Sequence, residues 1–391
     1  MKFAHVADTH LGYRQFGLIE REKDFYEVFE KIIDKIIQED VDFVIHSGDL
    51  FETAKPSPNA LLVFQKGLLK LKGAGIPMYA IAGNHDSVMR QGAIPPQVVF
   101  KKLGLKVISP INKEYEYEDI FIGGLPYYPK SKIKSFKEDL ANLANKAKNY
   151  SRAILVLHQG IDKYLPFQYE LEIGDLPENF DYYALGHIHN YINDDYGKGK
   201  LVYPGSTDIW KSNEMGDYLK HGKGFCVVDL NASKPSVKRV KIDIPREFLS
   251  KTIDYSSLTH DLLNLKTTIK DLEHKPILNL TVNNVESGSN EVYERINEEI
   301  GDYCLMIRPK FNTDDGKEEK KVLLGENNSL GPKELLYNNL KSYDNEDISN
   351  LAIELYDNLS KDKTEESKKI ISQFYDDYFE KITVDLKSRE G

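Results

Sequence analysis

Short runs of β-branched and aromatic residues alternate with longer stretches of helical periodicity between residue 2 and about residue 230. Apolar runs such as KFAHV, VDFVIH, PMYAIA, RAILVLH and DYYALG are typical of buried strands. The stretches between them repeat apolar residues at helical spacing, and strands that alternate with helices form sheets covered by helices. The pattern therefore predicts a layered α/β domain with helices flanking the sheets.

The composition changes after KGFCVVDL, and three further regions follow. Residues 233–312 contain SVKRVKIDI, ILNLTVNN, EVYERINEEI and YCLMIRPKF, which are enough for a small α/β cap domain. A polar stretch, FNTDDGKEEKK, indicates a linker over residues 313–330. Residues 331–391 are expected to form a helical tail, so the first domain covers residues 1–232.

The tail contains two sets of apolar residues at helical spacing, which predict two amphipathic helices. The two sets are Ile348, Leu351, Ala352, Leu355 and Leu359, and then Ile371, Phe374, Tyr375, Tyr378, Phe379 and Ile382. These helices either pack on the protein's own core or dock on a partner. The preceding linker and the aromatic face of the second helix favour docking.

Composition and charge narrow the class of protein. The chain has 52 Lys and Arg against 62 Asp and Glu, a net charge of -10, which argues against indiscriminate binding to polyanions. Only 2 Cys are present, which suits a reducing compartment. Neither a secretory signal nor an apolar run of about 18 residues is found. We expect an intracellular, cytoplasmic protein without a membrane segment.

Polar residues of the kinds that bind metals follow each apolar run in the first domain. They form D-x-H at Asp8 and His10, G-D at residues 48–49, G-N-H-D at residues 83–86, a lone His158 and G-H-I-H at residues 186–189. A period of two predicts that Asp8 and His10 lie on one side of an extended backbone. Loops at the ends of strands can direct several side chains to one point, so we expect a metal site there.

The predicted ligand set mixes carboxylate, imidazole and amide groups and lacks sulfur, which suits manganese, iron or zinc. Single histidines in a sequence are more often structural than ligands. We place His5, His46, His221, His260 and His274 in that structural or surface group.

These blocks, in this order, resemble those of the calcineurin-like metallophosphoesterases over residues 1 to about 210. The flanking segments KFAHVADTHLGYRQFG, HSGDLFE, AGNHD, ALGHIH and YPGSTDIW are similar to the Mre/SbcD nucleases, which work with a Rad/SbcC coiled-coil ATPase. The resemblance implies a layered β-sandwich flanked by helices. It also implies two Mn²⁺ ions per subunit.

By this resemblance, the two ions share Asp49, the first is also held by Asp8, His10 and His189, and the second by Asn84, His158 and His187. His85 is then the catalytic residue beside the scissile phosphate, with Asp86 orienting it from behind. The chain departs from many relatives at Glu52, where they carry His after DLF. A phosphate contact from position 52 is therefore in doubt.

No helix or finger motif that reads bases is recognisable, so DNA contacts should be made to the backbone and depend on salt. The candidate residues follow the metal motifs and are Arg14, Gln15 and Arg90, with a further cluster at Lys130, Lys132 and Lys134. The alternative for each of them is an ordinary solvated surface residue.

The predicted helix NALLVFQKGLLKL has more apolar surface than one core-facing stripe uses. Leu61, Phe64, Leu68 and Leu71 form one stripe, and Leu62 and Leu69 add a second. The resemblance implies that helices in this region pair two subunits. We therefore expect a homodimer interface that includes Leu61, Leu62, Phe64, Leu68 and Leu69, and the alternative is a thicker core within one subunit.

The resemblance as a whole implies a DNA nuclease of double-strand-break repair. It would act as a 3′–5′ exonuclease on duplexes and as an endonuclease on single strands and hairpins. The homodimer would form a nucleoid-associated heterotetramer with the ATPase. The same dimetal chemistry would also serve a phosphatase or phosphodiesterase acting on a small phosphoester, and this alternative stays open.

Overall fold

The computed structural model of the chain describes residues 1–87, 94–285, 288–312, 346–359 and 366–375. The chain divides into two compact units, Met1–Pro245 and Arg246–Gly391. The first unit ends after β12 (Ser236–Ile242), so it extends past the expected boundary at residue 232. β12 belongs to the first unit because it pairs along its length with β11 (Lys223–Asp229).

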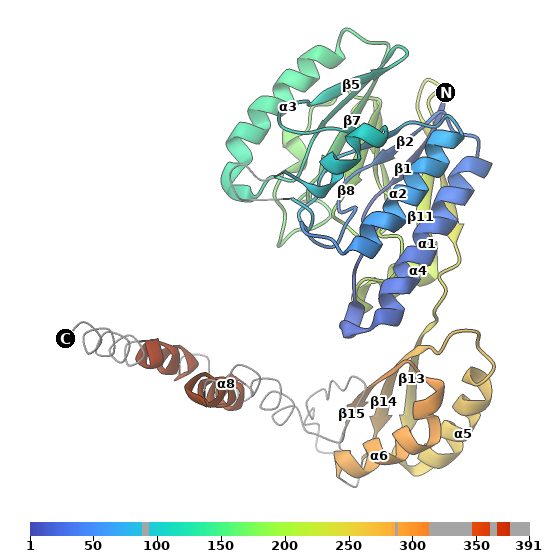
Figure 1. Cartoon of the computed structure of the whole chain (residues 1–391), viewed down its shortest axis with the longest axis vertical. Coiled ribbons are helices and arrows are strands. Elements are labelled where there is room, and N and C mark those ends of the chain that lie inside the picture. The colour runs from blue at the N-terminus through green and yellow to red at the C-terminus, as the bar shows by residue number, and fades with distance from the viewer. Residues whose placement is uncertain (88–93, 286–287, 313–345, 360–365, 376–391) are drawn as a thin grey trace. The chain divides into compact units, whose positions relative to one another are not determined.

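The first unit contains two six-stranded sheets (Figure 1). The first sheet has the order β12-β11-β1-β2-β3-β4, with β1 (Lys2–Val6), β2 (Phe43–His46), β3 (Met78–Ala80) and β4 (Lys106–Val107) parallel to one another. The second has the order β5-β6-β7-β8-β10-β9. Its strands are β5 (Glu114–Tyr117), β6 (Ile120–Leu125), β7 (Arg152–His158), β8 (Tyr182–Gly186), β9 (Ile192–Tyr196) and β10 (Gly199–Tyr203).

Helices cover the outer faces of the two sheets. They are α1 (Ile19–Gln38) and α2 (Pro58–Gly73) on the first sheet and α3 (Ile133–Ala147) on the second. The short α4 (Met215–His221) has no buried residue. In the described ranges the 3₁₀ segments are η1 (Gln15–Gly17), η2 (Pro96–Leu103), η3 (Lys130–Lys132), η4 (Ile173–Asp175), η5 (Ser212–Glu214), η6 (Tyr255–Ser257) and η7 (Gly301–Tyr303). α2 begins where Ser57 caps the backbone N–H of Ala60 and Pro58 supplies the first helical residue.

Three apolar cores hold these layers together, and the alternation along β1 shows how the sequence builds them. Phe3 faces the core between the sheets, where its ring stacks on Phe43 and meets Tyr182 edge-on. Ala4 and Val6 face the opposite way, toward α1 and α2. A third core joins α3 to the second sheet. The predicted layered β-sandwich flanked by helices is confirmed.

The second unit has a parallel sheet of β13 (Phe248–Asp254), β14 (Ile277–Asn283) and β15 (Met306–Phe311), joined by α5 (Leu258–Ile269) and α6 (Ser289–Ile300). One apolar core lies between these helices and the sheet. Further along the chain, α8 (Glu346–Leu359) and residues 366–375 are helical. Within the described ranges, no helix is long and apolar enough to cross a membrane.

Candidate metal centre

The metal motifs converge because they follow the carboxyl ends of parallel strands in both sheets. Asp8 follows β1, Asp49 follows β2 and Asn84 follows β3, while His158 ends β7 and His187 follows β8. The two sheets are packed face to face, so these loops meet at one end of the sandwich. Every ligand predicted from the sequence lies in this one cluster.

Unusual backbone conformations bring the ligands close together. Asp8, His10, Asp49 and His187 all have positive φ angles, of 53°, 44°, 52° and 90°. Such angles are strained in non-glycine residues and are typical of functional sites. The predicted extended conformation of D-x-H is therefore wrong, since β1 ends at Val6 and the two side chains converge from a left-handed loop.

Glycine is required in two of the motifs for lack of space. A Cβ atom on Gly48 would lie 2.2 Å from Nδ1 of His158, and one on Gly186 would lie 2.2 Å from the carbonyl oxygen of Ser47. Both contacts are far inside van der Waals distance. Gly48 of the G-D motif thus lets its loop approach the ring of His158, and Gly186 of the G-H-I-H motif lets its loop approach the carbonyl oxygen of Ser47.

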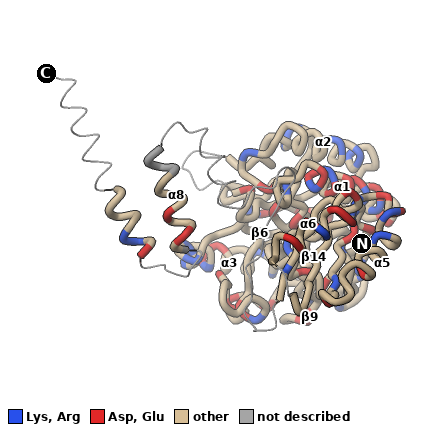
Figure 2. Tube along the Cα trace, turned by 90° about the horizontal axis from the view of Figure 1, so that it is seen from below, with Lys and Arg blue, Asp and Glu red and all other residues tan. Residues whose placement is uncertain are grey.

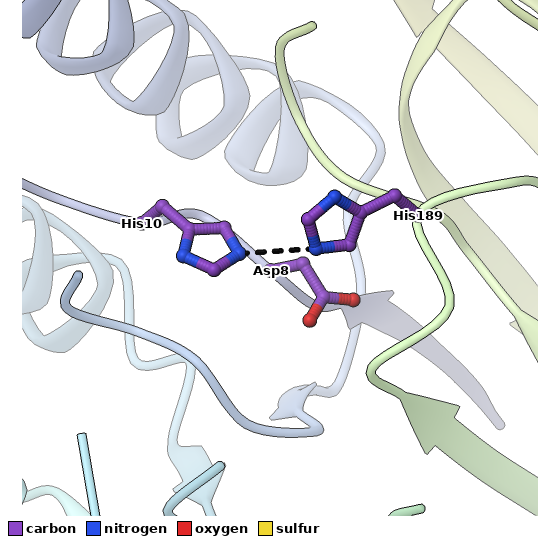
Figure 3. Close-up of side chains that lie close together, drawn as sticks. All are labelled: Asp8, His10 and His189. Carbon is purple, nitrogen blue, oxygen red and sulfur yellow. Dashed lines mark hydrogen bonds between the residues drawn. The ribbon is translucent and has the colours of Figure 1, made fainter. Parts of the chain in front are cut away.

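The first ligand group contains Asp8, His10 and His189, whose ligand atoms lie within 4.8 Å of one another (Figure 3). Nδ1 of His10 bonds to Oε2 of Glu52 at 2.8 Å, and Nδ1 of His189 bonds to Oε1 of Glu214 at 2.9 Å. An ionised carboxylate only accepts, so both protons belong on Nδ1. The two Nε2 atoms, 3.1 Å apart, then face each other as acceptors, an arrangement that a cation between them would satisfy.

The second group contains Asp8, Asp49 and His158, again within 4.8 Å. His158 Nδ1 donates to the carbonyl oxygen of Ser47 at 2.8 Å, so Nε2 is an acceptor when the ring is neutral. That Nε2 faces two further acceptors, Oδ1 of Asn84 at 3.0 Å and Oδ2 of Asp49 at 3.2 Å. When the ring is neutral, these acceptors have no donor between them, and either a proton on Nε2 or a second cation would satisfy them.

Asn84 and Asp49 link these groups to the remaining ligands. Oδ1 of Asn84 also lies 2.8 Å from Nδ1 of His187. Oδ2 of Asp49 lies 3.9 Å from Nε2 of His10, which places this carboxylate between the two groups. A bridging position for Asp49 is consistent with these distances.

The carboxylates strongly favour positive charge at this point. Burial lowers the pKa of His158, but the carboxylates of Asp49 and Asp8 outweigh burial and raise it to about 9. Burial raises the pKa of Asp49, yet the imidazoles of His158 and His10 bring it well below its usual range. The residues present therefore fit divalent cations both in donor type and in charge.

His85 lies at the open edge of the cluster, with its side chain 24% exposed. Its Nδ1 lies 3.2 Å from the carbonyl oxygen of Glu52 and 3.4 Å from Oε1 of the same residue. Burial lowers the pKa of His85, but the carboxylates of Glu52 and Asp49 raise it to about 9. Glu52 thus has a role that the sequence did not reveal, as the common partner of His10 and His85.

Asp86 does not have the position expected for it. Its carboxylate accepts from the backbone N–H groups of Phe51 and Gly83 and from the side chain of Gln97. It therefore braces the loops that follow β2 and β3, and the orientation of His85 depends on Glu52 instead. Among the other histidines, His5 bonds to Tyr182 and Ser47, which confirms a structural role.

Trp210 forms one wall of the site and was not among the predicted residues. It is the only Trp of the chain, and its ring stacks on His10 at 5.4 Å between centroids. It also meets His85 and His189 edge-on. The sequence offered one hint of this position, because the only Trp of the chain ends the YPGSTDIW segment, which comes after the last metal motif.

The candidate DNA contacts have different outcomes. Arg14 is half exposed and pairs with Glu22, so it stays a candidate. Gln15 is only 2% exposed, donates to the carbonyl oxygen of Trp210 and accepts from Arg21, so it is structural and cannot reach DNA. Arg90 lies outside the described residues. Lys130, on η3, lies over the ring of Tyr169 at 4.1 Å.

The candidate interface residues of α2 fall into two sets. Phe64 and Leu68 are buried against α1 and the first sheet, and Leu61 is half-buried against the same core. Phe64 and Leu68 were wrongly assigned to an interface, because they face the protein's own core, while partly buried Leu61 stays a candidate. Leu62 and Leu69 are 53% and 44% exposed and stay candidates.

The surface of the neighbouring helix α1 is charged, with Lys and Arg interspersed with Asp and Glu along it (Figure 2).

The fold and the converging ligands define a metallophosphoesterase, and residues 1–191 match the family model of the calcineurin-like phosphoesterases. The chain is 39% identical to the DNA double-strand break repair protein Mre11 of Methanococcus maripaludis, over 83% of this chain and 87% of that protein. It is 42% identical to the protein of that name from Methanocaldococcus jannaschii, over 71% and 75%. The Saccharolobus solfataricus protein of the same name is 32% identical over 93% and 96%. The chain therefore belongs to the Mre11 family of calcineurin-like phosphoesterases.

Proposed function

We propose that this protein is a manganese-dependent nuclease that processes DNA ends in double-strand-break repair. One observation carries the proposal: imidazole, carboxylate and amide acceptors converge at the strand ends of a chain that belongs to the Mre11 family. The relatives are named for double-strand break repair, which makes DNA the substrate that we expect.

Each side chain of the centre has a role in this proposal. Asp8, His10 and His189 would hold one cation, Asn84, His158 and His187 the other, and Asp49 both. When bound, the cation pair activates a water for attack and stabilises charge on the phosphate. His85, on the open edge, donates a proton to the leaving oxygen, and Glu52 fixes the ring that does so.

The choice of manganese and the reaction modes also belong to the proposal. The mixed oxygen and nitrogen ligands suit Mn²⁺. We expect 3′–5′ exonuclease activity on duplex DNA and endonuclease activity on single strands and hairpins. Half-exposed Arg14, together with the cap over residues 233–312, is expected to contact the DNA backbone without reading sequence.

The partners follow from the surfaces left exposed. Leu62 and Leu69 lie one heptad apart on α2, and we infer that they pair two subunits. The region from residue 331 onward is proposed to bind a coiled-coil ATPase, giving a nucleoid-associated heterotetramer. In its described part, Tyr356, Ile371 and Tyr375 are exposed apolar side chains suited to docking.

The direct test is cleavage of end-labelled duplex DNA and circular single-stranded DNA with Mn²⁺, compared with Mg²⁺ and EDTA. We expect Mn²⁺-dependent cutting that Asp49→Ala reduces to the level seen with EDTA, because the bridging carboxylate is lost. An Asp181→Asn variant serves as a control, since Asp181 is also a buried, paired carboxylate but precedes β8 at its other end.

Intact DNA in every reaction would contradict the nuclease proposal. Bis-nitrophenyl phosphate is included as a second substrate. If this ester is hydrolysed while DNA stays whole, the metal chemistry stands and the small-phosphoester alternative replaces the DNA assignment.

A further inference from the structure

A buried carboxylate lies directly behind His189. Glu214, at the end of η5, is only 3% exposed and accepts hydrogen bonds on both carboxylate oxygens. Oε1 accepts from Nδ1 of His189 at 2.9 Å and from the backbone N–H of Lys211 at 3.0 Å. These contacts fix the side chain of Glu214 relative to the histidine ring.

The second oxygen of Glu214 is tied to another strand. Oε2 accepts from Nζ of Lys223, from Oγ of Ser206 at 2.9 Å and from the backbone N–H of Trp210 at 3.3 Å. Lys223 is itself 1% exposed and begins β11, next to β1 in the first sheet. The buried ion pair therefore connects the G-H-I-H loop of the second sheet to the first sheet.

Lys223 acts on the histidine from two sides. Its Nζ neutralises Glu214 and also donates to the backbone carbonyl oxygen of His189 at 3.3 Å. Burying the charged carboxylate of Glu214 without a partner would cost free energy, and Lys223 offsets that cost. Because Lys223 also bonds to the backbone of His189, the imidazole has little freedom to move. The backbone and the ring of His189 are thus restrained by one network.

We propose that Glu214, anchored by Lys223, is a positioning residue that keeps His189 protonated on Nδ1 and directs its Nε2 at the first cation. The inference rests on the proposed metal centre and deepens it. Partners of this kind set the tautomer and ring orientation of metal-binding histidines. Glu52 makes the same type of contact to His10, but it is shared with His85 and is more exposed.

The test is a Mn²⁺ titration of the full chain, followed by the EPR signal of free Mn²⁺, for wild type and Glu214→Gln. Glutamine keeps the shape but loses the charge that Lys223 and His189 require. We expect the affinity for one ion to fall by about 10–100-fold, with the other ion bound as in wild type. Fluorescence of Trp210 reports occupancy at the site itself, since its ring centroid lies 5.1 Å from that of His189.

Asp181→Asn is the matched control. Asp181 is a buried carboxylate paired with Arg152 and Lys198 in the same unit, but it lies at the opposite end of β8 from the ligands. It should lower the melting temperature and leave Mn²⁺ affinity unchanged. A general loss of stability would affect both variants alike, whereas positioning affects only Glu214→Gln.

Ser206→Ala keeps the inference testable if Glu214→Gln does not fold. Ser206→Ala removes the contacts of this hydroxyl with Oε2 of Glu214, Nζ of Lys223 and the carbonyl oxygen of Asp208, and it should weaken binding of the same ion by about fivefold. Wild-type affinity for both ions in a folded variant would overturn the role of Glu214. If the wild-type chain itself binds no Mn²⁺, the proposed function fails instead, so the two failures are distinguishable.

Discussion

The two carboxylates behind the first ligand group differ in their surroundings. The side chain of Glu214 is 4% exposed and pairs with a buried lysine, whereas that of Glu52 is 17% exposed and serves both His10 and His85. The side of the centre that contains Glu214 is fixed by the fold. The side that contains Glu52 is more exposed, and we propose that the phosphodiester binds there.

This difference separates two tasks that metallophosphoesterase sites must perform. A rigid, buried side holds ligands in one geometry, so that binding a cation requires little rearrangement. An accessible side must admit the substrate and place a proton donor next to it. We expect substitutions on the buried side to change metal affinity and those on the open side to change the rate.

Among substitutions that leave every candidate ligand in place, the largest effect on rate is expected for His85→Gln. This variant removes the proton donor but none of the ligands, so cleavage should fall by about 10²–10⁴-fold. Mn²⁺ stoichiometry should stay as in wild type, measured by the same EPR titration. Full activity in this variant, or loss of a bound ion, would break the separation between the two sides.

A smaller effect is expected for Glu52→Gln. The amide can still accept from one histidine, but it no longer supplies the negative charge that His10 and His85 share. We expect the cleavage rate to fall by about tenfold and Mn²⁺ affinity to change less than in Glu214→Gln. A Glu52→Gln variant that loses Mn²⁺ affinity as strongly as Glu214→Gln would show that the two carboxylates are equivalent.

The smallest effect on chemistry is expected for a double change far from both sides, Leu62→Lys with Leu69→Lys. Both side chains are exposed on α2, so the free energy of unfolding should change by no more than about 0.5 kcal/mol per site. Light scattering should show monomers in place of dimers, with hydrolysis of bis-nitrophenyl phosphate unchanged.

Phe64→Ala is the contrasting control for this pair. Phe64 is fully buried, so its loss should cost about 3–5 kcal/mol of stability. A wild-type chain that is monomeric at micromolar concentration would contradict the interface.

That the candidate ligands come together could be predicted from the sequence, because each motif is local. A short polar block after an apolar run is visible without knowledge of its neighbours, and parallel strands then bring the blocks together. Their backbone was not predictable in the same way, since period two placed the side chains of Asp8 and His10 on one side of an extended backbone and the structure has a left-handed loop there.

The residues that support the ligands escaped prediction because their contacts are long-range. Glu214 lies 25 residues after His189, and Lys223 lies 34 residues after it, with no motif to connect them. On α2, periodicity identified the apolar residues but not which stripe faces the core. That choice depends on α1 and the first sheet, which bury Phe64 and Leu68 and leave Leu62 and Leu69 outside.

The most direct test of the metal centre is a crystal of the chain grown with Mn²⁺ and measured by anomalous diffraction at the manganese edge. We predict two peaks, one among Asp8, His10, Asp49 and His189 and the other among Asp49, Asn84, His158 and His187. A single peak, or a peak among His10, Glu52 and His85, whose ligand atoms also lie within 4.8 Å of one another, would contradict this assignment.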